Sequence, residues 1–262
     1  MMPEIFSVGP FVVRGYGLMW VVGIIVAVLI AARRAPRFGM KPENAIDSAL
    51  AGVFGGVVGA RIVYVAMNWR EFRDNWLEVF AIWQGGLGFF GGLVGGSLGV
   101  YLCMRAKKMS FWPAADCFAP SLALAYAIAR LGCLLAGCCY GCPTGVPWGL
   151  TFPMEDRPGV MTEPSHPTQI YSFLFGLGIF AALLLLEKRK RFTGQTFCQF
   201  LMLYGAYRFV NEFFRAGATS KYWVEPFTFG HLAAIGALAF GLALYLWRSS
   251  LNKSAVEPSK QS

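Results

Sequence analysis

Charged residues are scarce in this sequence. They make up 14% of its 262 residues, whereas about a quarter of the residues in a soluble domain are charged, and 56% are hydrophobic. This balance excludes an ordinary soluble protein and indicates one that lies in a membrane.

Long apolar runs give the same indication. Six of them approach or exceed the ~20 residues that cross a bilayer, and a seventh, residues 111–129, is interrupted by Pro113, Asp116 and Pro120. The sequence therefore predicts an all-α, polytopic membrane protein with about seven transmembrane helices. They would form a single domain over residues 1–249, followed by a disordered cytoplasmic tail over residues 250–262. The six runs are residues 18–32, 45–67, 89–104, 170–186, 196–214 and 229–247.

Basic residues are absent from the start of the chain. No Lys or Arg precedes Arg14, and Arg33 and Arg34 follow the first apolar run instead of leading it. This order favours a retained helix with its N-terminus outside over a cleaved secretory signal. Most of the 23 Lys and Arg residues fall at alternate ends of the predicted helices. By the positive-inside rule these ends and the C-terminus are cytoplasmic, so the net charge of +9 reflects topology and predicts no nucleic-acid partner.

Four arginines lie within or at the edge of the apolar segments: Arg14, Arg61, Arg130 and Arg208. A charge at the middle of a bilayer costs at least ~2.5 to 3.5 kcal/mol, so such residues normally face a polar cavity or a partner. These arginines are therefore candidates for a functional site.

The segment 196–214 and the residue after it carry a polar series with spacings of four, four and three: Tyr204, Arg208, Glu212 and Arg215. These spacings place the side chains on one stripe of a helix. Two arginines and one glutamate leave net positive charge, which suits an anionic ligand; the alternative is a closed Arg208–Glu212 pair that the fold tolerates. A guanidinium matches phosphate bidentately, and the phosphate of a membrane belongs to phospholipid head groups. The stripe predicts a lipid-binding cavity.

Four cysteines lie within the run ARLGCLLAGCCYGCP, residues 129–143, on the predicted outer side. A zinc site is one alternative, since Cys139 and Cys142 form a C-x-x-C pair. A second pair is lacking and only His166 is near in sequence, so the sequence favours no metal. The oxidising side of a membrane permits a disulfide of Cys142 with Cys138 or Cys133. A thiolate at Cys133 or Cys138 and plain apolar packing are the remaining alternatives.

Seven motifs occur in the order RGYGLMW, GARIVYV, WQGGLGFFGG, DCFAP, ARLGCLLAGCCYG, HPTQIY and YGAYRFVNEFFR. Their order and spacing resemble those of the prolipoprotein diacylglyceryl transferase family. The resemblance covers residues 16–247, and its most specific parts are the last two motifs. It implies a seven-helix, multi-pass protein of the bacterial inner membrane.

Enzymes of this family transfer the diacylglyceryl group of phosphatidylglycerol to the lipobox cysteine thiol of a prelipoprotein, and glycerol 1-phosphate leaves. The resemblance thus implies phosphatidylglycerol or a similar anionic phospholipid and a prelipoprotein signal peptide as partners, with no cofactor. Arg130 and Arg208 would hold the phosphate and stabilise the charge on the leaving group. Tyr16 and Tyr204 would orient the head group or relay a proton, which completes the predicted catalytic set. The predicted substrate-binding residues are Arg61, Gly141, Glu212, Arg215 and His166.

The chain departs from the family pattern at several polar positions. Cys133, Ala136 and Cys138 stand where relatives carry two asparagines and a glutamate. Phe90 replaces a histidine often assigned to proton transfer, and Ser172 stands where the His-Pro run usually continues to glutamate. Loss of a general base commonly costs about 10²- to 10⁴-fold in rate. Two alternatives to the family reaction therefore stay open: a divergent paralogue with another acceptor, and a non-catalytic or redox-linked lipid-binding membrane protein.

Overall fold

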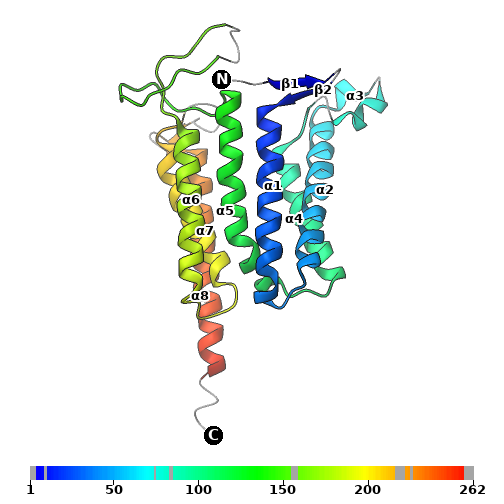
Figure 1. Cartoon of the computed structure of the whole chain (residues 1–262), viewed down its shortest axis with the longest axis vertical. Helices are drawn as coiled ribbons and strands as arrows, with labels where there is room; N and C mark the ends of the chain where they lie inside the picture. The colour runs from blue at the N-terminus through cyan, green and yellow to red at the C-terminus, as the bar shows by residue number, and fades with distance from the viewer. Residues whose placement is uncertain are drawn as a thin grey trace. The chain divides into compact units, whose positions relative to one another are not determined.

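The computed structural model describes residues 4–8, 11–73, 75–82, 85–154, 159–215, 222–224 and 227–256. Within these residues the chain is predominantly helical (Figure 1). The seven long helices are α1 (Gly15–Arg34), α2 (Pro42–Met67), α4 (Phe89–Ala106), α5 (Phe111–Ala136), α6 (Thr168–Glu187), α7 (Gln195–Glu212) and α8 (Phe229–Val256).

Five of these helices, namely α1, α2, α5, α6 and α8, are long and apolar enough to cross a membrane. The chain is therefore a polytopic helical membrane protein, as the apolar runs predicted. Helices α4 and α7 have 18 residues each and coincide with the two other predicted spans, 89–104 and 196–214. Because α7 carries Arg208 and Glu212, its mean hydropathy is low for its length, and the count of seven spans stays a prediction.

Short elements connect the long helices. One-turn helices are η1 (Ala35–Phe38), α3 (Trp69–Phe72) and η2 (Trp76–Phe80). Two small antiparallel sheets pair β1 (Glu4–Val8) with β2 (Phe11–Arg14) and β3 (Tyr222–Val224) with β4 (Phe227–Thr228). The expectation of an all-α chain did not include these strands, because segments of two to five residues are too short to show a period of two.

The first part of the predicted disordered tail is helical. Helix α8 continues through Ser250 and ends at Val256, inside the range 250–262 that was predicted to be disordered. Residues 257–262 lie outside the described part of the chain.

The chain forms two compact units. The larger comprises residues 1–27 and 115–262, and the smaller comprises residues 28–114. Helix α1 passes from the larger unit into the smaller, and each unit has its own packing.

In the smaller unit, α2 and α4 pack closely side by side (Figure 1). A Cβ at Gly55 would lie 2.5 Å from the carbonyl oxygen of Gly95, and a Cβ at Gly95 would lie 2.8 Å from the Cα of Gly59. Real side chains cannot approach backbone this closely, so glycine is required on both helices. The two helices therefore pack through faces of small residues.

In the larger unit, α7 packs between α6 and α8. Tyr207 of α7 forms a buried apolar cluster with Ile179 and Leu183 of α6. At Gly205 a Cβ would lie 2.8 Å from the backbone nitrogen of Leu238, which brings α7 and α8 into backbone contact. The start of α7 is held by α5, because the Asp116 carboxylate accepts hydrogen bonds from the backbone N–H groups of Gly194 and Phe197 at 2.6 and 2.9 Å.

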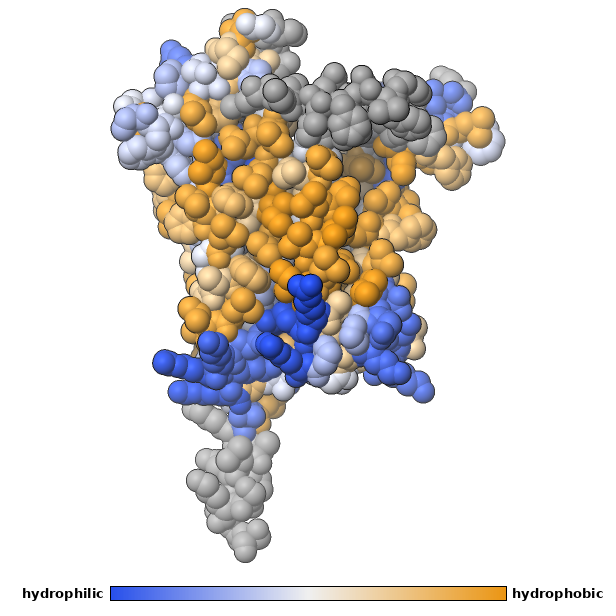
Figure 2. Space-filling view, viewed as in Figure 1, coloured by the Kyte–Doolittle hydropathy of each residue, from blue (hydrophilic) through white to orange (hydrophobic). Residues whose placement is uncertain are grey.

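Large apolar side chains on the long helices face outward. Phe54 is 74% exposed and Val94 is 67% exposed, both on helices of the smaller unit. Figure 2 shows apolar residues over the middle of the helices and hydrophilic residues at their ends. Lipid tails would cover such apolar surface at no hydrophobic cost, whereas water would not.

Candidate functional site

The polar stripe of α7 lies in the larger unit, but its last member is not on the helix. Helix α7 ends at Glu212, and Arg215 instead forms an isolated antiparallel bridge with Gly141. Tyr204, Arg208 and Glu212 remain at the predicted spacing of one turn each. The expected continuous helical stripe is therefore wrong for Arg215, because the chain leaves the helix to pair with the loop after α5.

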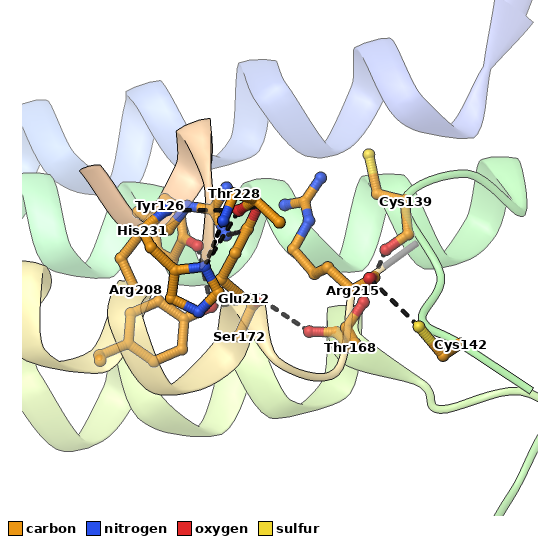
Figure 3. Close-up of polar contacts among 11 residues, drawn as sticks. Tyr126, Cys139, Cys142, Thr168, Ser172, Arg208, Glu212, Arg215, Thr228 and His231 are labelled. Carbon is orange, nitrogen blue, oxygen red and sulfur yellow. Dashed lines mark hydrogen bonds and ion pairs between the residues drawn. The ribbon is translucent and has the colours of Figure 1, made fainter. Parts of the chain in front are cut away.

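Glu212 is held in place by two groups. Its Oε2 lies 2.5 Å from Nη1 of Arg208, and its Oε1 accepts a hydrogen bond of 3.0 Å from the Thr228 hydroxyl (Figure 3). Glu212 is only 2% exposed. Gly230 allows this position, since a Cβ there would overlap the Glu212 carboxylate. The ion pair orients the Arg208 guanidinium and compensates a charge that would otherwise be costly to bury.

Arg130 is placed differently from Arg208. Its guanidinium lies over the Tyr126 ring, 4.7 Å from the ring centroid and one helical turn away on α5. Within the described residues, no carboxylate and no hydrogen-bond acceptor contacts it. The π-face of Tyr126 supports the cation but leaves its five N–H donors available for an anion.

The Tyr204 hydroxyl lies within electrostatic range of three arginines: Arg208, Arg130 and Arg215. The ring of Tyr204 packs edge-on against Tyr126, with centroids 5.4 Å apart. The structure therefore brings together the predicted residues from α5, α7 and the segment after α7, and leaves an excess of positive charge there.

A chain of hydroxyl groups lies beneath this cluster. Tyr207 donates a hydrogen bond of 2.5 Å to Ser172, and Ser172 donates one of 2.6 Å to the carbonyl oxygen of Thr168. The hydroxyls of Tyr126 and Tyr207 are 3.0 Å apart, and Tyr126 must be the donor because the Tyr207 proton is already used. Ser172 thus fixes Tyr207, which accepts a hydrogen bond from Tyr126. The Arg130 guanidinium lies over the Tyr126 ring.

Sequence reasoning missed Tyr126 and Tyr207 as members of the site. A signal was present for Tyr126, which precedes Arg130 by four residues and so shares its helix face. Tyr207 had no comparable signal, because its partners Tyr126 and Ser172 are 81 and 35 residues away in the chain.

The loop after α5 is held against the end of α7. Gly141 donates a backbone hydrogen bond of 2.8 Å to His166, and Cys142 donates one of 2.9 Å to Phe214. A Cβ at Gly141 would lie 2.8 Å from both His166 Cβ and Thr168 Cγ2 and would overlap the Phe214 carbonyl. Gly141 therefore determines how closely the loop approaches Arg215, and its predicted role in substrate binding stays a prediction.

His166 supports this loop. Its backbone N–H donates 3.0 Å to the Cys142 carbonyl, and its Nδ1 lies 3.1 Å from the Tyr171 hydroxyl. The imidazole also packs against the Phe214 ring, with centroids 5.2 Å apart. These contacts position backbone, and a role of His166 in substrate binding stays a prediction.

Tyr16 lies at the start of α1, next to the end of α5. A Cβ at Gly132 would lie 3.1 Å from the Tyr16 carbonyl oxygen and 3.0 Å from Met19 Cβ, so Gly132 lets the two helices approach. Tyr16 is 42% exposed. Its hydroxyl interacts electrostatically with the thiols of Cys133 and Cys138. Tyr16 is thus available to a ligand at the edge of the cluster.

All seven cysteines are free thiols in the structure. The sulfurs of Cys133, Cys138 and Cys139 lie within 4.8 Å of one another. Cys142 is not part of this group: its thiol donates a hydrogen bond of 3.3 Å to the Arg215 carbonyl (Figure 3). Hydrogen bonds from the other two thiols, together with Arg215 and Arg130, hold the pKa of Cys139 well below its usual value. The pKa of Cys138 is raised by its bonds to Cys133 and Cys139 and by burial.

Arg61 lies in the smaller unit and is fully engaged by backbone. Its Nη2 and Nε donate to the carbonyls of Glu78 and Val79 at 2.6 and 2.8 Å. Its Nη1 donates to those of Gly85 and Gly86 at 2.8 and 3.1 Å. The backbone φ angles of these two glycines are positive, +90° and +73°, which turns their carbonyls toward the guanidinium. Arg61 therefore fixes the backbone at Glu78, Val79, Gly85 and Gly86, and its predicted contact with substrate stays a prediction.

Comparison with known proteins gives a consistent result. A family model described as prolipoprotein diacylglyceryl transferase matches residues 3–247. A protein of Geobacter sulfurreducens named phosphatidylglycerol–prolipoprotein diacylglyceryl transferase is 36% identical over 92% of this chain and 93% of its own length. Proteins of the same name from Nostoc sp. and Synechocystis sp. are 32% and 30% identical, over 94% and 99% of this chain and 88% and 93% of their own lengths.

Proposed function

Because this chain belongs to the prolipoprotein diacylglyceryl transferase family, we propose that it transfers a diacylglyceryl group from phosphatidylglycerol to the lipobox cysteine of a prelipoprotein. The observation that carries this proposal is the Arg130 guanidinium, which rests on Tyr126 with no anionic partner among the described residues. In the reaction the glyceryl C–O bond to phosphate breaks and a C–S bond forms. The thiol proton balances the second negative charge of the glycerol 1-phosphate that leaves.

Arg130 binds the phosphate of the donor lipid. Its planar fork offers parallel N–H donors to two phosphate oxygens, and its stacking on Tyr126 fixes the plane of the fork before the lipid arrives. In a water-poor site such a preorganised cation stabilises the leaving phosphate more than the intact diester, because charge grows as the C–O bond breaks.

Arg208 contributes the second cation. Its ion pair with Glu212 leaves the guanidinium oriented, and Thr228 keeps the carboxylate from turning away. Arg208 acts on the Tyr204 hydroxyl together with Arg130 and Arg215. We place Tyr204 against the same phosphate, where it donates a hydrogen bond, and Tyr16 at the edge where the acceptor thiol enters.

The hydrogen-bonded hydroxyls of Tyr126, Tyr207 and Ser172 support Arg130 through the Tyr126 ring. Tyr126 donates toward Tyr207, which donates to Ser172, so the ring beneath the guanidinium cannot rotate freely. Ser172 stands where the resemblance led us to expect a glutamate, and its hydroxyl bonds to Tyr207 and to the Thr168 carbonyl.

The partners and location follow from this proposal. The donor is phosphatidylglycerol or a similar anionic phospholipid, the acceptor is the signal peptide of a prelipoprotein, and the protein is a multi-pass protein of the bacterial inner membrane with seven spans. This location is supported by five helices that are long and apolar enough to cross a membrane, and by the apolar residues over the middle of the molecule in Figure 2.

Complementation tests the proposal. The chain is expressed in bacteria depleted of their own prolipoprotein diacylglyceryl transferase, and lipoproteins are examined by mass spectrometry for the diacylglyceryl thioether. We expect growth and thioether formation with the natural chain, and neither with Arg130→Ala at equal membrane abundance. Thioether formation that survives Arg130→Ala would contradict the phosphate site.

The same cells also test the alternative that the diacylglyceryl group passes to an acceptor other than a prelipoprotein. If the natural chain reaches the membrane but forms no thioether, lipids of the same cells are compared with and without expression. A new diacylglyceryl product that depends on Arg130 would then identify a divergent paralogue, whereas retained lipid binding without any product would identify a binding protein.

A further inference from the structure

Three thiols gather at the end of α5, and the transfer reaction proposed above does not use them. The sulfurs of Cys133, Cys138 and Cys139 lie within 4.8 Å of one another. We propose that they form a binding site for a thiophilic d¹⁰ cation, with Zn²⁺ as the ion to which we commit. This set differs from the C-x-x-C pair of Cys139 and Cys142 that the sequence offered for a zinc site, because Cys142 lies outside the cluster.

Two of the thiols are brought together by the way α5 ends. Cys138 donates its backbone N–H to the Cys133 carbonyl at 3.1 Å, and Gly137 donates to Leu134 at 3.1 Å. Gly137 has φ +72°, so these bonds form a Schellman motif. In that motif the third residue before the cap and the second after it pack side by side, and here both are cysteines.

The third thiol is placed by an unusual backbone conformation. Cys139 has φ +62°, a left-handed conformation that costs a residue with a side chain of order 1 kcal/mol or more. The surrounding structure enforces it. The Thr168 hydroxyl donates 2.7 Å to the Cys139 carbonyl, and the Gln169 amide donates 2.7 Å to the Cys138 carbonyl. The first turn of α6 thus holds the loop with its side chains turned back toward α5.

The spacing of the sulfurs fits one ion. Zinc–sulfur bonds are about 2.3 Å long, so sulfurs around a tetrahedral zinc lie about 3.8 Å apart. A separation within 4.8 Å therefore closes by rotation of the side chains, with no change in the backbone. Three thiolates and an open fourth position form a typical zinc coordination set, and soft sulfur ligands exclude Mg²⁺ and Ca²⁺.

The surroundings also favour bound thiolates. Three thiolates and one Zn²⁺ carry a net charge of −1, and Arg130 and Arg215 both act electrostatically on Cys139. Cys133 is buried at 7% exposure, whereas Cys138 and Cys139 are half-buried, so an ion can enter from the loop side. Cys142 is exposed, and its thiol faces the Arg215 carbonyl instead of the cluster (Figure 3).

Titration of the full chain tests this site. The protein is purified in detergent, fully reduced, and freed of metal by chelation, and all seven thiols are first counted after denaturation. Co²⁺ is then added to give a thiolate-to-cobalt charge-transfer band, and Zn²⁺ is added to displace it. We expect one equivalent of each ion and a higher Tm in the presence of zinc, because zinc binds the folded chain preferentially.

Single substitutions identify the ligands. Cys133→Ser, Cys138→Ser and Cys139→Ser should each weaken zinc binding by at least about 100-fold, since changes outside the ligand shell alone cost about 10- to 100-fold. Cys142→Ser is the matched control and should bind as the natural chain does. The Tm of each metal-free variant shows whether it has folded, and Cys→Ala replaces any serine variant that has not.

The result that overturns the site is equally direct. If the fully reduced natural chain binds less than one equivalent of Zn²⁺, or if Cys142→Ser weakens binding as much as the three cluster substitutions, the proposal is wrong. Diacylglyceryl transfer is measured on the same samples, and its presence or absence decides the proposed function separately, because the zinc site does not rest on it.

Discussion

Nη1 of Arg208 lies 2.5 Å from Oε2 of Glu212, one turn further along α7. Glu212 is buried and also accepts a hydrogen bond from Thr228. Thr228 therefore holds the Glu212 carboxylate in place, and the carboxylate in turn orients the Arg208 guanidinium. Removing the charge of the Glu212 carboxylate should therefore disturb the position of Arg208 more than the hydrogen bond from Thr228.

Glu212→Gln should lower kcat/KM by about 100-fold, equivalent to about 2.7 kcal/mol of transition-state stabilisation. The amide keeps an oxygen for Thr228 but can no longer neutralise and orient Arg208, whose position relative to the phosphate becomes variable. Initial rates of diacylglyceryl transfer in detergent measure this. Thr228→Val is the comparison variant. It removes the hydroxyl that bonds to the Glu212 carboxylate and to His231 but keeps the Arg208–Glu212 ion pair, so we expect a smaller loss of about tenfold. Equal rates for Glu212→Gln and the natural chain would exclude an orienting role.

Arg130→Ala should reduce kcat by about 10³-fold, as expected when a donor to the developing charge is lost, and Arg130→Lys should recover only part of it. The Tm should change by no more than about 2 °C, because Arg130 contacts Tyr126 and no acceptor within the described residues. Rates and Tm are measured on the same preparations. A large drop in Tm would mean that Arg130 is structural.

Arg61→Lys should show the opposite pattern. The guanidinium makes four hydrogen bonds to backbone carbonyls from residues 78–86, and an ammonium group cannot reach them all. Hydrogen bonds to a charged group contribute about 1.5–3 kcal/mol each, so we expect a loss of roughly 3 kcal/mol or more in stability. Thermal unfolding in detergent measures it, with Arg105→Lys at an exposed position as control. An unchanged Tm would contradict the structural role.

Gly141→Ala should lower both stability and activity. A methyl group would overlap the Phe214 carbonyl and press on His166 and Thr168, so the loop must move away from Arg215. Overpacking of this kind costs about 1–3 kcal/mol. Gly145→Ala is a matched control in the same loop, because nothing lies within 4 Å of its Cβ position. Tm and initial rates are compared for the two variants, and equal effects would show that the loop tolerates displacement.

Local patterns were enough for the helical architecture. Hydropathy over about 20 residues is a property of consecutive positions, so α1, α2, α5, α6 and α8 could be located from composition alone. The spacing of Tyr204, Arg208 and Glu212 predicted a shared face for the same reason, because 3.6 residues per turn is a local rule. The ordered motifs likewise identified the family to which the chain belongs.

Contacts between distant segments were decided only by the tertiary structure. Arg61 was a candidate ligand because its charge lies in an apolar run. Only the structure shows that its guanidinium bonds to the carbonyls of Glu78 and Gly85, and its contact with substrate stays a prediction. Arg215 left the predicted helix because its backbone pairs with Gly141, 74 positions earlier in the chain. The sequence by itself determined which segments are long and apolar enough to cross a membrane and which charges interrupt them, since both depend on neighbours along the chain. Only the tertiary structure decided which arginine is available to a phosphate and which three thiols lie together. Both depend on contacts between residues that are distant in the sequence.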